Sequence, residues 1–346
     1  MKIVIAGGTG QVGRVLERSL RARGHELVVL GRGTLGRGTL GRGGADARHL
    51  RWDGRSLGPW VDEIDGADVV INLAGRSVNC RYTAANLDAM MASRVDSTRA
   101  VGLAIENAKR PPRVWLQMST ATIYAHRFDA PNDEATGQLG GDEPHVPGYW
   151  KRSIDIAKAW EAAQLEAKTP QTRKVALRSA MVMSPDPGGV LDVLLGLTRL
   201  GLGGPIGGGR QYVSWIHERD FARAVAFLIE RDDLDGPVNL AAPNPIPQRE
   251  FMAALRAASG TRIGLPATKW MAEIGAFFLR TDTELTLKSR RVIPGRLLDA
   301  GFAFELPEWP AAAYDLCERW RAARRSSRQP LAPQGATSED PTQGTV

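Results

Sequence analysis

The sequence predicts an α/β protein in which a doubly wound parallel sheet is joined to a small, mostly helical C-terminal lobe. Three observations support this prediction. The chain opens with a short apolar run at residues 2–6, a glycine-rich turn and an amphipathic helix. Further apolar runs of strand length alternate with helical patterns as far as residue 243, and the segment from residue 244 is mainly helical in pattern. Strands that alternate with helices are typical of parallel sheets covered on both faces.

The first turn is the most informative stretch of the chain. Gly7, Gly10 and Gly13 stand between an apolar strand and a helix that should end near Gly24. The first glycine permits a tight turn, the second lets backbone approach a pyrophosphate, and the third lets helix and strand pack closely. Phosphate oxygens would accept hydrogen bonds from N–H groups at the positive end of the helix. This context predicts a Rossmann-type dinucleotide site rather than a glycine turn without a ligand. Its expected members in the turn are Gly7, Thr9, Gly10, Gln11, Val12 and Gly13.

The end of the second strand, residues 26–30, predicts which dinucleotide binds. An acidic residue there would bind an adenosine ribose hydroxyl, but the sequence has Gly31-Arg32. An arginine can bind a 2′-phosphate through two hydrogen bonds and stack on adenine, so we expect NADP(H). A solvent-facing Arg32 is the alternative. Asp53 follows a short strand near residues 50–52 and is expected to accept a hydrogen bond from the adenine amine, or to lie on the surface.

Two further strands should complete the cofactor side of the sheet. The apolar run at 67–75 ends in Leu73, Ala74 and Gly75, and the small residues Ala74 and Gly75 would let the backbone pass close to the cofactor. A second run at 114–118 leads into Ser119-Thr120-Ala121-Thr122-Ile123-Tyr124. The remaining predicted elements are a helix over 84–108, a helix that starts after about residue 147 and ends at 167, a sixth strand that begins with 174–178, a strand at 212–217 and a helix over 220–231.

The sequence also predicts how the chain is divided. Residues 1–243 should form the NADP-binding domain, with 185–212 contributing to the substrate lobe as a mobile cover or a plain surface helix. Residues 244–325 should form the C-terminal domain, with helices over 250–258, 268–279 and 309–325. We expect a disordered tail over 326–346. A five-residue duplication over 33–42 is expected to be a flexible loop extension beside the adenosine.

Composition limits the classes of function. The formal charge of +7 could suggest nucleic acid, but the arginines are spread along the chain and no reading motif is present. No run of 18 apolar residues occurs, so no transmembrane helix is expected, and the first residues do not resemble a signal peptide. Cys80 and Cys317 form no metal-ligand pattern, which favours a reduced cytoplasmic setting. We therefore expect a small-molecule substrate, no metal, no nucleic acid and no membrane, and the sequence leaves a homodimer open.

The motifs together resemble the extended short-chain dehydrogenase/reductases, the NAD-dependent epimerase/dehydratase-like group. The resemblance rests on the glycine turn, on Asn72-Leu73-Ala74-Gly75, on Ser119 to Tyr124 and on Leu177-Arg178. Segments 201–205, 214–220 and 287–294 resemble one branch of that group. Members of the branch carry a C-terminal domain of unassigned function, and some are labelled cell-division inhibitors. The resemblance covers about residues 1 to 320.

The resemblance implies a Tyr-x-x-x-Lys pair that handles the proton and a Ser or Thr that holds the substrate oxygen. Thr120 matches the second position, but Ser153 follows Tyr149 where the lysine should stand. Lys158 falls on the opposite side of the helix from Tyr149. Tyr149 is therefore an unassisted catalytic candidate or a half-buried aromatic residue. Family epimerases also often carry an asparagine where this chain has Met181, so a nucleotide-sugar substrate is not expected.

His217 is the remaining catalytic candidate. A neutral imidazole near a nicotinamide could donate or accept a proton, and the alternative is a structural histidine paired with a neighbour such as Asp220. Two functions from different classes follow. The first is an NADP(H)-binding, epimerase-like oxidoreductase or isomerase that lacks the Tyr-x-x-x-Lys pair. The second is a catalytically silent NADP(H)-binding regulator, with the C-terminal lobe as its partner surface.

Overall fold

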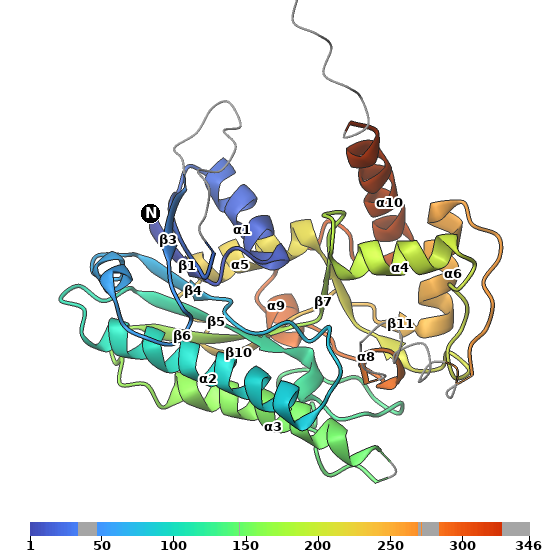
Figure 1. The fold of residues 1–346 in the computed structure, drawn as a ribbon, viewed down its shortest axis with the longest axis horizontal. Helices are drawn as coiled ribbons and strands as arrows, with labels where there is room; N and C mark the ends of the chain where they lie inside the picture. Colours follow the sequence, from blue (N-terminus) through green and yellow to red (C-terminus); the bar gives the residue numbers. More distant parts are fainter. Residues whose placement is uncertain (34–46, 145, 269–270, 272–283, 327–346) are drawn as a thin grey trace, which may run out of the picture.

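A computed structural model describes residues 1–33, 47–144, 146–268, 271 and 284–326 of the chain. Its main sheet has seven parallel strands in the order β10-β6-β5-β4-β1-β2-β3 (Figure 1). The doubly wound parallel sheet is therefore confirmed. The strands of this sheet are β1 (Lys2–Ala6), β2 (Glu26–Gly31), β3 (Arg48–Arg51), β4 (Val69–Asn72), β5 (Val114–Thr120), β6 (Arg173–Ser179) and β10 (Gly236–Leu240).

Alternation along the strands divides the core between two faces. In β1, Ile3 and Ile5 join one hydrophobic cluster, whereas Val4 and Ala6 join another. Because successive side chains of a strand point to opposite faces, each cluster belongs to one layer of helices. Figure 1 shows the two layers on either side of the sheet. One layer contains α1 (Gln11–Ala22) and α5 (Glu218–Glu230), and the other contains α2 (Ala84–Glu106) and α3 (Gly148–Leu165).

The strand order reverses at β1, and the glycine turn lies at that reversal. β1 pairs with β2 on one side and with β4 on the other. The turn after β1 is tied to both neighbours, because Gly7 N donates to Leu30 O at 2.9 Å and Leu73 N donates to Ala6 O at 2.8 Å. Ligands of open α/β sheets bind outside the carboxyl ends of the strands at such a point.

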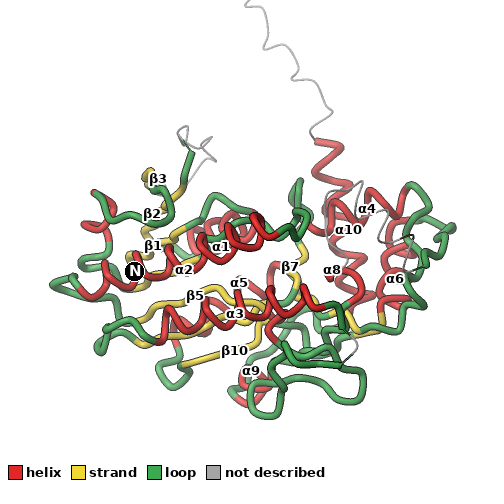
Figure 2. The backbone as a smooth tube through the Cα atoms, turned by 60° about the horizontal axis from the view of Figure 1, so that its bottom comes forward, coloured by secondary structure: helices red, strands yellow, loops and turns green. Residues whose placement is uncertain are grey.

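A third cluster forms the core of the smaller lobe. Phe251 stacks on Trp309 with ring centroids 4.0 Å apart, and Trp309 Nε1 donates to Phe251 O. Trp215 meets the same indole edge-on. Figure 2 shows the helices of this lobe gathered beside the sheet. The lobe contains α4 (Val190–Arg199), α6 (Gln248–Ser259), α8 (Glu284–Leu287) and α10 (Trp309–Ser326), and α9 (Gly295–Asp299) lies nearer to β10.

Short elements connect the two parts. The predicted strand at 212–217 is split into β8 (Tyr212–Val213) and β9 (Trp215–His217). The break falls at Ser214, whose hydroxyl donates to Arg290 O and accepts from Val292 N. β9 pairs with β7 (Met181–Met183), and β8 pairs with β11 (Ile246–Pro247). Two short 3-10 helices complete the described elements, η1 (Pro59–Glu63) and η2 (Ala121–Ile123).

Several expectations lie outside the described residues or remain predictions. The duplication at 33–42 falls mostly outside them, as do the helix at 268–279 and the tail beyond Ser326. The division after residue 243 stays a prediction. Strand β10 was not predicted, although it is the edge strand beside β6. Among the described residues, no helix is long and apolar enough to cross a membrane, and no cluster of three or more His, Cys, Asp or Glu residues could hold a metal.

Candidate functional site

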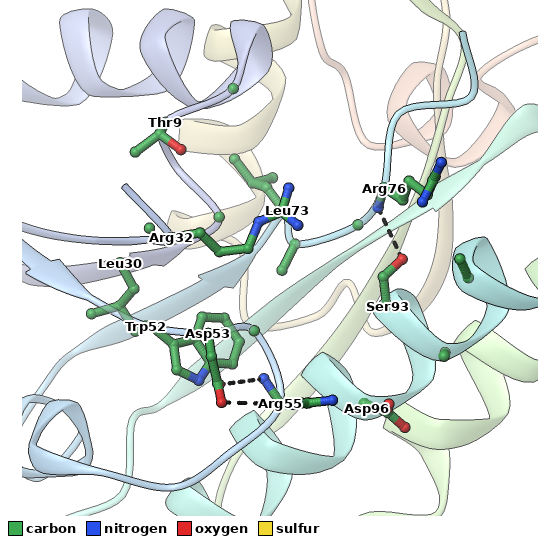
Figure 3. Close-up of a pocket in the computed structure, with 18 residues that line it drawn as sticks. Thr9, Leu30, Arg32, Trp52, Asp53, Arg55, Leu73, Arg76, Ser93 and Asp96 are labelled. Carbon is green, nitrogen blue, oxygen red and sulfur yellow. Dashed lines mark hydrogen bonds and ion pairs between the residues drawn. The ribbon is translucent and has the colours of Figure 1, made fainter. Parts of the chain in front are cut away.

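A cavity of about 490 Å³ opens where the chain leaves β1, β2, β3 and β4 (Figure 3). The turns after these strands and one face of α2 enclose the cavity. Because β1 and β4 are the neighbouring strands at which the order reverses, the cavity lies at that reversal. Eight of the predicted cofactor-binding residues line it: Gly7, Thr9, Gly10, Arg32, Asp53, Leu73, Ala74 and Gly75. Its other lining residues are Leu30, Gly31, Trp52, Gly54, Arg55, Arg76, Ala89, Ala92, Ser93 and Asp96.

The glycines of the first turn meet different steric demands. Gly7 has a φ of +75°, and a Cβ there would lie 2.6 Å from the backbone of Ala74. A Cβ at Gly13 would overlap the backbone of Gly8, so helix and turn pack closely there. At Gly10 the nearest atom to a Cβ would be Gly7 O, 3.9 Å away. Gly10 therefore keeps its free side toward the cavity, where a ligand can approach the backbone.

The start of α1 suits a bound phosphate. Gly10 is the N-cap of the helix and no side chain caps its first turn. The first N–H groups of a helix have no acceptor within the helix, so they are available to an anion. Gln11, Val12 and Gly13 belong to this first turn and are not among the residues that line the cavity. The side chain of Gln11 lies against Gly189, the N-cap of α4.

The adenosine end of the predicted site is built after β2 and β3. Arg32 is exposed and reaches into the cavity (Figure 3). Asp53 Oδ1 accepts hydrogen bonds from the backbone N–H groups of Ser56 at 2.8 Å and Arg55 at 2.9 Å. These bonds hold the pKa of Asp53 below its usual range. Trp52 is buried against Trp60, with ring centroids 5.0 Å apart.

Trp52 and Arg55 were missed by sequence reasoning, although both are neighbours of Asp53. The signal that could have found them is local, because residues next to a strand end share the edge at which ligands bind. Arg76 was missed in the same way, since it directly follows Gly75.

Thr120 ends β5, and its hydroxyl is already engaged. Thr120 Oγ1 accepts a hydrogen bond from Thr122 N at 3.1 Å and thereby caps η2. Below it, Ser119 Oγ donates to Glu161 at 2.6 Å, and Glu161 pairs with Arg178 at 2.8 Å. This polar network anchors the end of the strand in the core. Thr120 itself is not among the residues that line the cavity.

Tyr149 is the second residue of α3, and its side chain is 36% exposed. The two lysines near it in sequence are bound elsewhere. Lys151 Nζ pairs with Asp142 at 3.2 Å, and Lys158 Nζ donates to Gly140 O at 3.0 Å. Ser153 Oγ lies 2.7 Å from both carboxylate oxygens of Glu284. The residue four positions after Tyr149 is therefore a serine whose hydroxyl is bound to a carboxylate.

Glu284 and Lys288 form a buried ion pair below this position. Lys288 Nζ lies 3.5 Å from Glu284 Oε1 and donates to Thr122 O at 2.9 Å. Burial lowers the pKa of Lys288 to about 8, against the raising effect of Glu284. Burial likewise raises the pKa of Glu284. Sequence reasoning missed this pair. Its signal was an acidic and a basic residue four positions apart, the spacing of neighbours on one helix face.

His217 lies at the contact between the sheet domain and α10, and it is fully buried. Its Nδ1 accepts from Arg219 N at 3.1 Å, and its Nε2 lies 3.0 Å from Asp315 Oδ2. Burial lowers the pKa of His217, although Asp315 opposes the shift. The carboxylate beside His217 is thus Asp315 and not Asp220, the expected example of a structural partner; the Asp220 carboxylate accepts from the backbone N–H groups of Glu305 and Leu306. His217 does not line the cavity.

Comparison with known families gives two matches along the chain. The sequence profile of the NAD dependent epimerase/dehydratase family matches residues 3–241. A second profile, described as a domain of unknown function (DUF1731), matches residues 267–316. The first match contains the cavity and β5, and the second contains Glu284 and Lys288.

Similar proteins cover nearly the whole chain. The epimerase family protein SDR39U1 of Bos taurus is 32% identical over 320 residues, which are 90% of this chain and 98% of that protein. The crystal structure of human SDR39U1 (isoform 2) with NADPH has a TM-score of 0.78 and 30% identity, covering 92% of this chain and 99% of that one. The UDP-N-acetylglucosamine 4-epimerase of Methanobrevibacter ruminantium has the same fold, with a TM-score of 0.68 at 14% identity over 93% of this chain and 98% of that one.

Proposed function

The chain belongs to the NAD dependent epimerase/dehydratase family, and we propose that it is an NADP(H)-dependent oxidoreductase or isomerase of the extended short-chain dehydrogenase type. Its substrate is a small polar or carbonyl compound. When bound, the nicotinamide supplies hydride transfer, and the protein supplies binding, orientation and the proton.

The cavity at the strand reversal is the observation that carries this proposal. It combines a glycine turn with open space at Gly10, an uncapped helix start and Arg32 at the adenosine end. An uncapped helix start attracts a pyrophosphate, and a guanidinium attracts a 2′-phosphate. The NADPH bound to the related human protein agrees with this choice of cofactor.

Different residues of the site bind different parts of the cofactor and the substrate. Gly7, Gly10 and the first turn of α1 hold the pyrophosphate, and Arg32 and Asp53 hold the adenosine end. Ala74 and Gly75 bring a turn of small residues close to the cofactor. At the end of β5, the hydroxyl of Thr120 holds the substrate oxygen, as the family resemblance implies.

The presence of Ser153, rather than a lysine, four residues after Tyr149 favours a second candidate function, that of a catalytically silent regulator. No tyrosine of the sequence is followed four residues later by a lysine, and the hydroxyl at that position of α3 binds Glu284. An unassisted phenol is a poor base at neutral pH, because its ordinary pKa is near 10. In this alternative the protein is a catalytically silent NADP(H)-binding regulator, and its C-terminal lobe contacts a partner.

Compartment and assembly belong to the same proposal. Cys80 and Cys317 are both free thiols, and a protein that keeps its cysteines reduced fits the cytoplasm. The proposal includes no nucleic-acid partner, and size measurements in solution decide between a monomer and a homodimer.

The test of cofactor binding is a titration of the full chain with NADPH and NADH, followed by fluorescence. We expect the parent protein to bind NADPH more tightly. Gly10→Val should abolish the binding of both, because its side chain would fill the space in which the backbone meets the pyrophosphate. Gly196→Val is the control, since a Cβ there also meets open space but lies in α4. Binding by Gly10→Val at the parent affinity, with a cooperative thermal transition, would contradict the proposal.

A further inference from the structure

Two arginines beside the cofactor cavity have no carboxylate partner within the described part of the chain. Many described arginines form ion pairs, such as Arg178 with Glu161 and Arg152 with Asp88. Arg76 and Arg94 form none with any residue that the structure describes. Arg76 follows the turn after β4, and Arg94 on α2 packs against Gly75 of that turn.

Arg94 is the more unusual of the two, because its side chain is nine-tenths buried. It is 9% exposed, and its guanidinium lies over the ring of Trp160 at 4.9 Å. Its hydrogen bond within the protein goes from Nη1 to Met90 O at 3.2 Å. Burial lowers the pKa of Arg94 to about 10, so the group is desolvated but still charged at neutral pH. A buried charge without a counter-ion is costly, and a bound anion removes that cost.

Arg76 brings a second guanidinium to the same helix face. Its Nη2 donates to Asn86 Oδ1 at 2.9 Å, and its backbone N–H donates to Ser93 Oγ at 2.9 Å. Asn86, Met90 and Arg94 follow one another at intervals of four residues on α2, so they form one row along the helix. Arg76 is therefore held at Asn86 of that row, and Arg94 at Met90, the next member of the row.

The turn between the two arginines is part of the cofactor cavity. Gly75 lines the cavity, and a Cβ on Gly75 would lie 3.5 Å from Arg94 Cζ. Figure 3 shows Arg76 and Ser93 on the far side of Leu73 from Arg32. The pair therefore lies at the carboxyl end of β4 and away from the adenosine end.

We propose that Arg76 and Arg94 form an oxyanion site that binds a carboxylate or phosphate group next to the cofactor. Two guanidiniums held in place suit such a group, because each offers parallel N–H donors to a pair of oxygens. The carboxylate of Asp88 on α2 is held by Arg152 at 2.6 Å, and Asp96 lines the cavity without pairing to either arginine. The anion comes from the substrate or from the cofactor itself. The first source rests on the proposed function.

Calorimetric titration with malonate and with inorganic phosphate tests the site. Each anion is titrated into the full chain, with and without saturating NADPH. We expect saturable binding of at least one anion to the parent protein. Arg94→Gln and Arg76→Gln should each weaken it at least tenfold, and Arg94→Lys should weaken it less than Arg94→Gln, because it keeps the charge but not the paired donors. The control is Arg99→Gln, an exposed arginine on the same helix that should leave the affinity unchanged.

The outcomes separate the two sources of the anion. An anion that binds the NADPH complex, with NADPH affinity equal in all variants, assigns the site to the substrate. Competition between the anion and NADPH, with weaker NADPH binding in both Gln variants, assigns the site to a cofactor phosphate. The proposal is overturned if the parent protein shows no saturable anion binding. It is also overturned if both Gln variants bind the anion with an affinity within twofold of the parent's.

Two further controls keep the test decisive. If Arg94→Gln loses its cooperative thermal transition, the exposed Arg76→Gln decides alone. If the parent protein binds no NADPH, the proposed cofactor function fails, and the titration of the cofactor-free chain still decides the oxyanion site.

Discussion

At the scale of a single residue, we propose that Arg32 sets the choice of cofactor. Its guanidinium reaches the adenosine end of the cavity, where a 2′-phosphate distinguishes NADPH from NADH. We expect the parent protein to bind NADPH at least tenfold more tightly, a difference of about 1.4 kcal/mol. Arg32→Ala should remove most of that difference, whereas Arg23→Ala, outside the cavity, should keep it. Fluorescence titrations of the parent and both variants with NADPH and NADH measure the six dissociation constants, and equal affinities in the parent would contradict the prediction.

Substitutions at Tyr149 and at Thr120 should affect turnover to different extents. Lys151 and Lys158 are bound away from Tyr149, and the residue four positions after Tyr149 is Ser153. We expect Tyr149→Phe to change NADPH-linked turnover by less than about tenfold, which is under 1.4 kcal/mol. Thr120→Val should cost more, because it removes the proposed holder of the substrate oxygen. A substrate panel followed by NADPH absorbance provides the measurement.

A large loss of turnover in Tyr149→Phe would contradict this prediction. General acid–base assistance is worth roughly 10²–10⁴-fold, so a thousandfold loss in Tyr149→Phe with intact NADPH affinity would make the tyrosine catalytic. If the parent protein turns over no carbonyl or sugar in the panel, the regulator function gains support.

Helices α5 and α10 are joined through His217, and the joint should depend on pH. Burial lowers the pKa of His217 although Asp315 opposes it, and Arg219 and Arg319 lower it further. An unfolded histidine titrates near 6.5, so the unfolded chain gains its proton first as the pH falls. The stabilisation from neutral His217 is therefore complete above about pH 6.5 and is lost as the pH falls toward the folded pKa.

Replacement of His217 by asparagine tests this sign. Asparagine can still cap α5 but does not titrate. We expect His217→Asn to lose less stability than the parent between pH 7 and pH 5, as measured by urea unfolding. A steeper loss in His217→Asn than in the parent, or an equal one, would contradict the assignment.

At the scale of the whole molecule, a buried ion pair joins three parts of the chain. Glu284 and Lys288 come from the C-terminal segment, Ser153 from α3 and Thr122 from the turn after β5. Breaking a buried pair by removing one member typically costs about 3–5 kcal/mol, and the charge of Arg290, which also lowers the pKa of Glu284, offsets part of that cost. Lys288→Met should therefore reduce the free energy of unfolding strongly. The double variant Lys288→Met/Glu284→Leu should be less destabilised than Lys288→Met alone.

A double-mutant cycle in urea measures this coupling. Lys151→Met, which breaks an exposed ion pair with Asp142, is the control and should leave stability unchanged within error. The single variants of the cycle are Lys288→Met and Glu284→Leu. Destabilisation in the double variant equal to the sum of these two would contradict the coupling.

Sequence reasoning found most of the sheet because each strand is encoded locally. The parallel strands read as continuous apolar runs, and β1, β4 and β5 lie where those runs predict them. Strand β10 was missed because its five residues begin with Gly236-Pro237, which are poor strand formers. In the C-terminal lobe, α6 and α10 follow the predicted helical pattern closely.

The sequence by itself determined the fold class and the glycine turn, because both depend on neighbouring residues. Gly7 needs its positive φ, and Gly10 its open side, within one short segment that the motif identifies directly. Only the tertiary structure brought Ser153 to Glu284 across 131 residues and His217 to Asp315 across 98. It also brought Arg94 to the turn at Gly75. Such contacts depend on how helices pack against one another, and side-chain partners on separate elements leave no periodic signal in the chain.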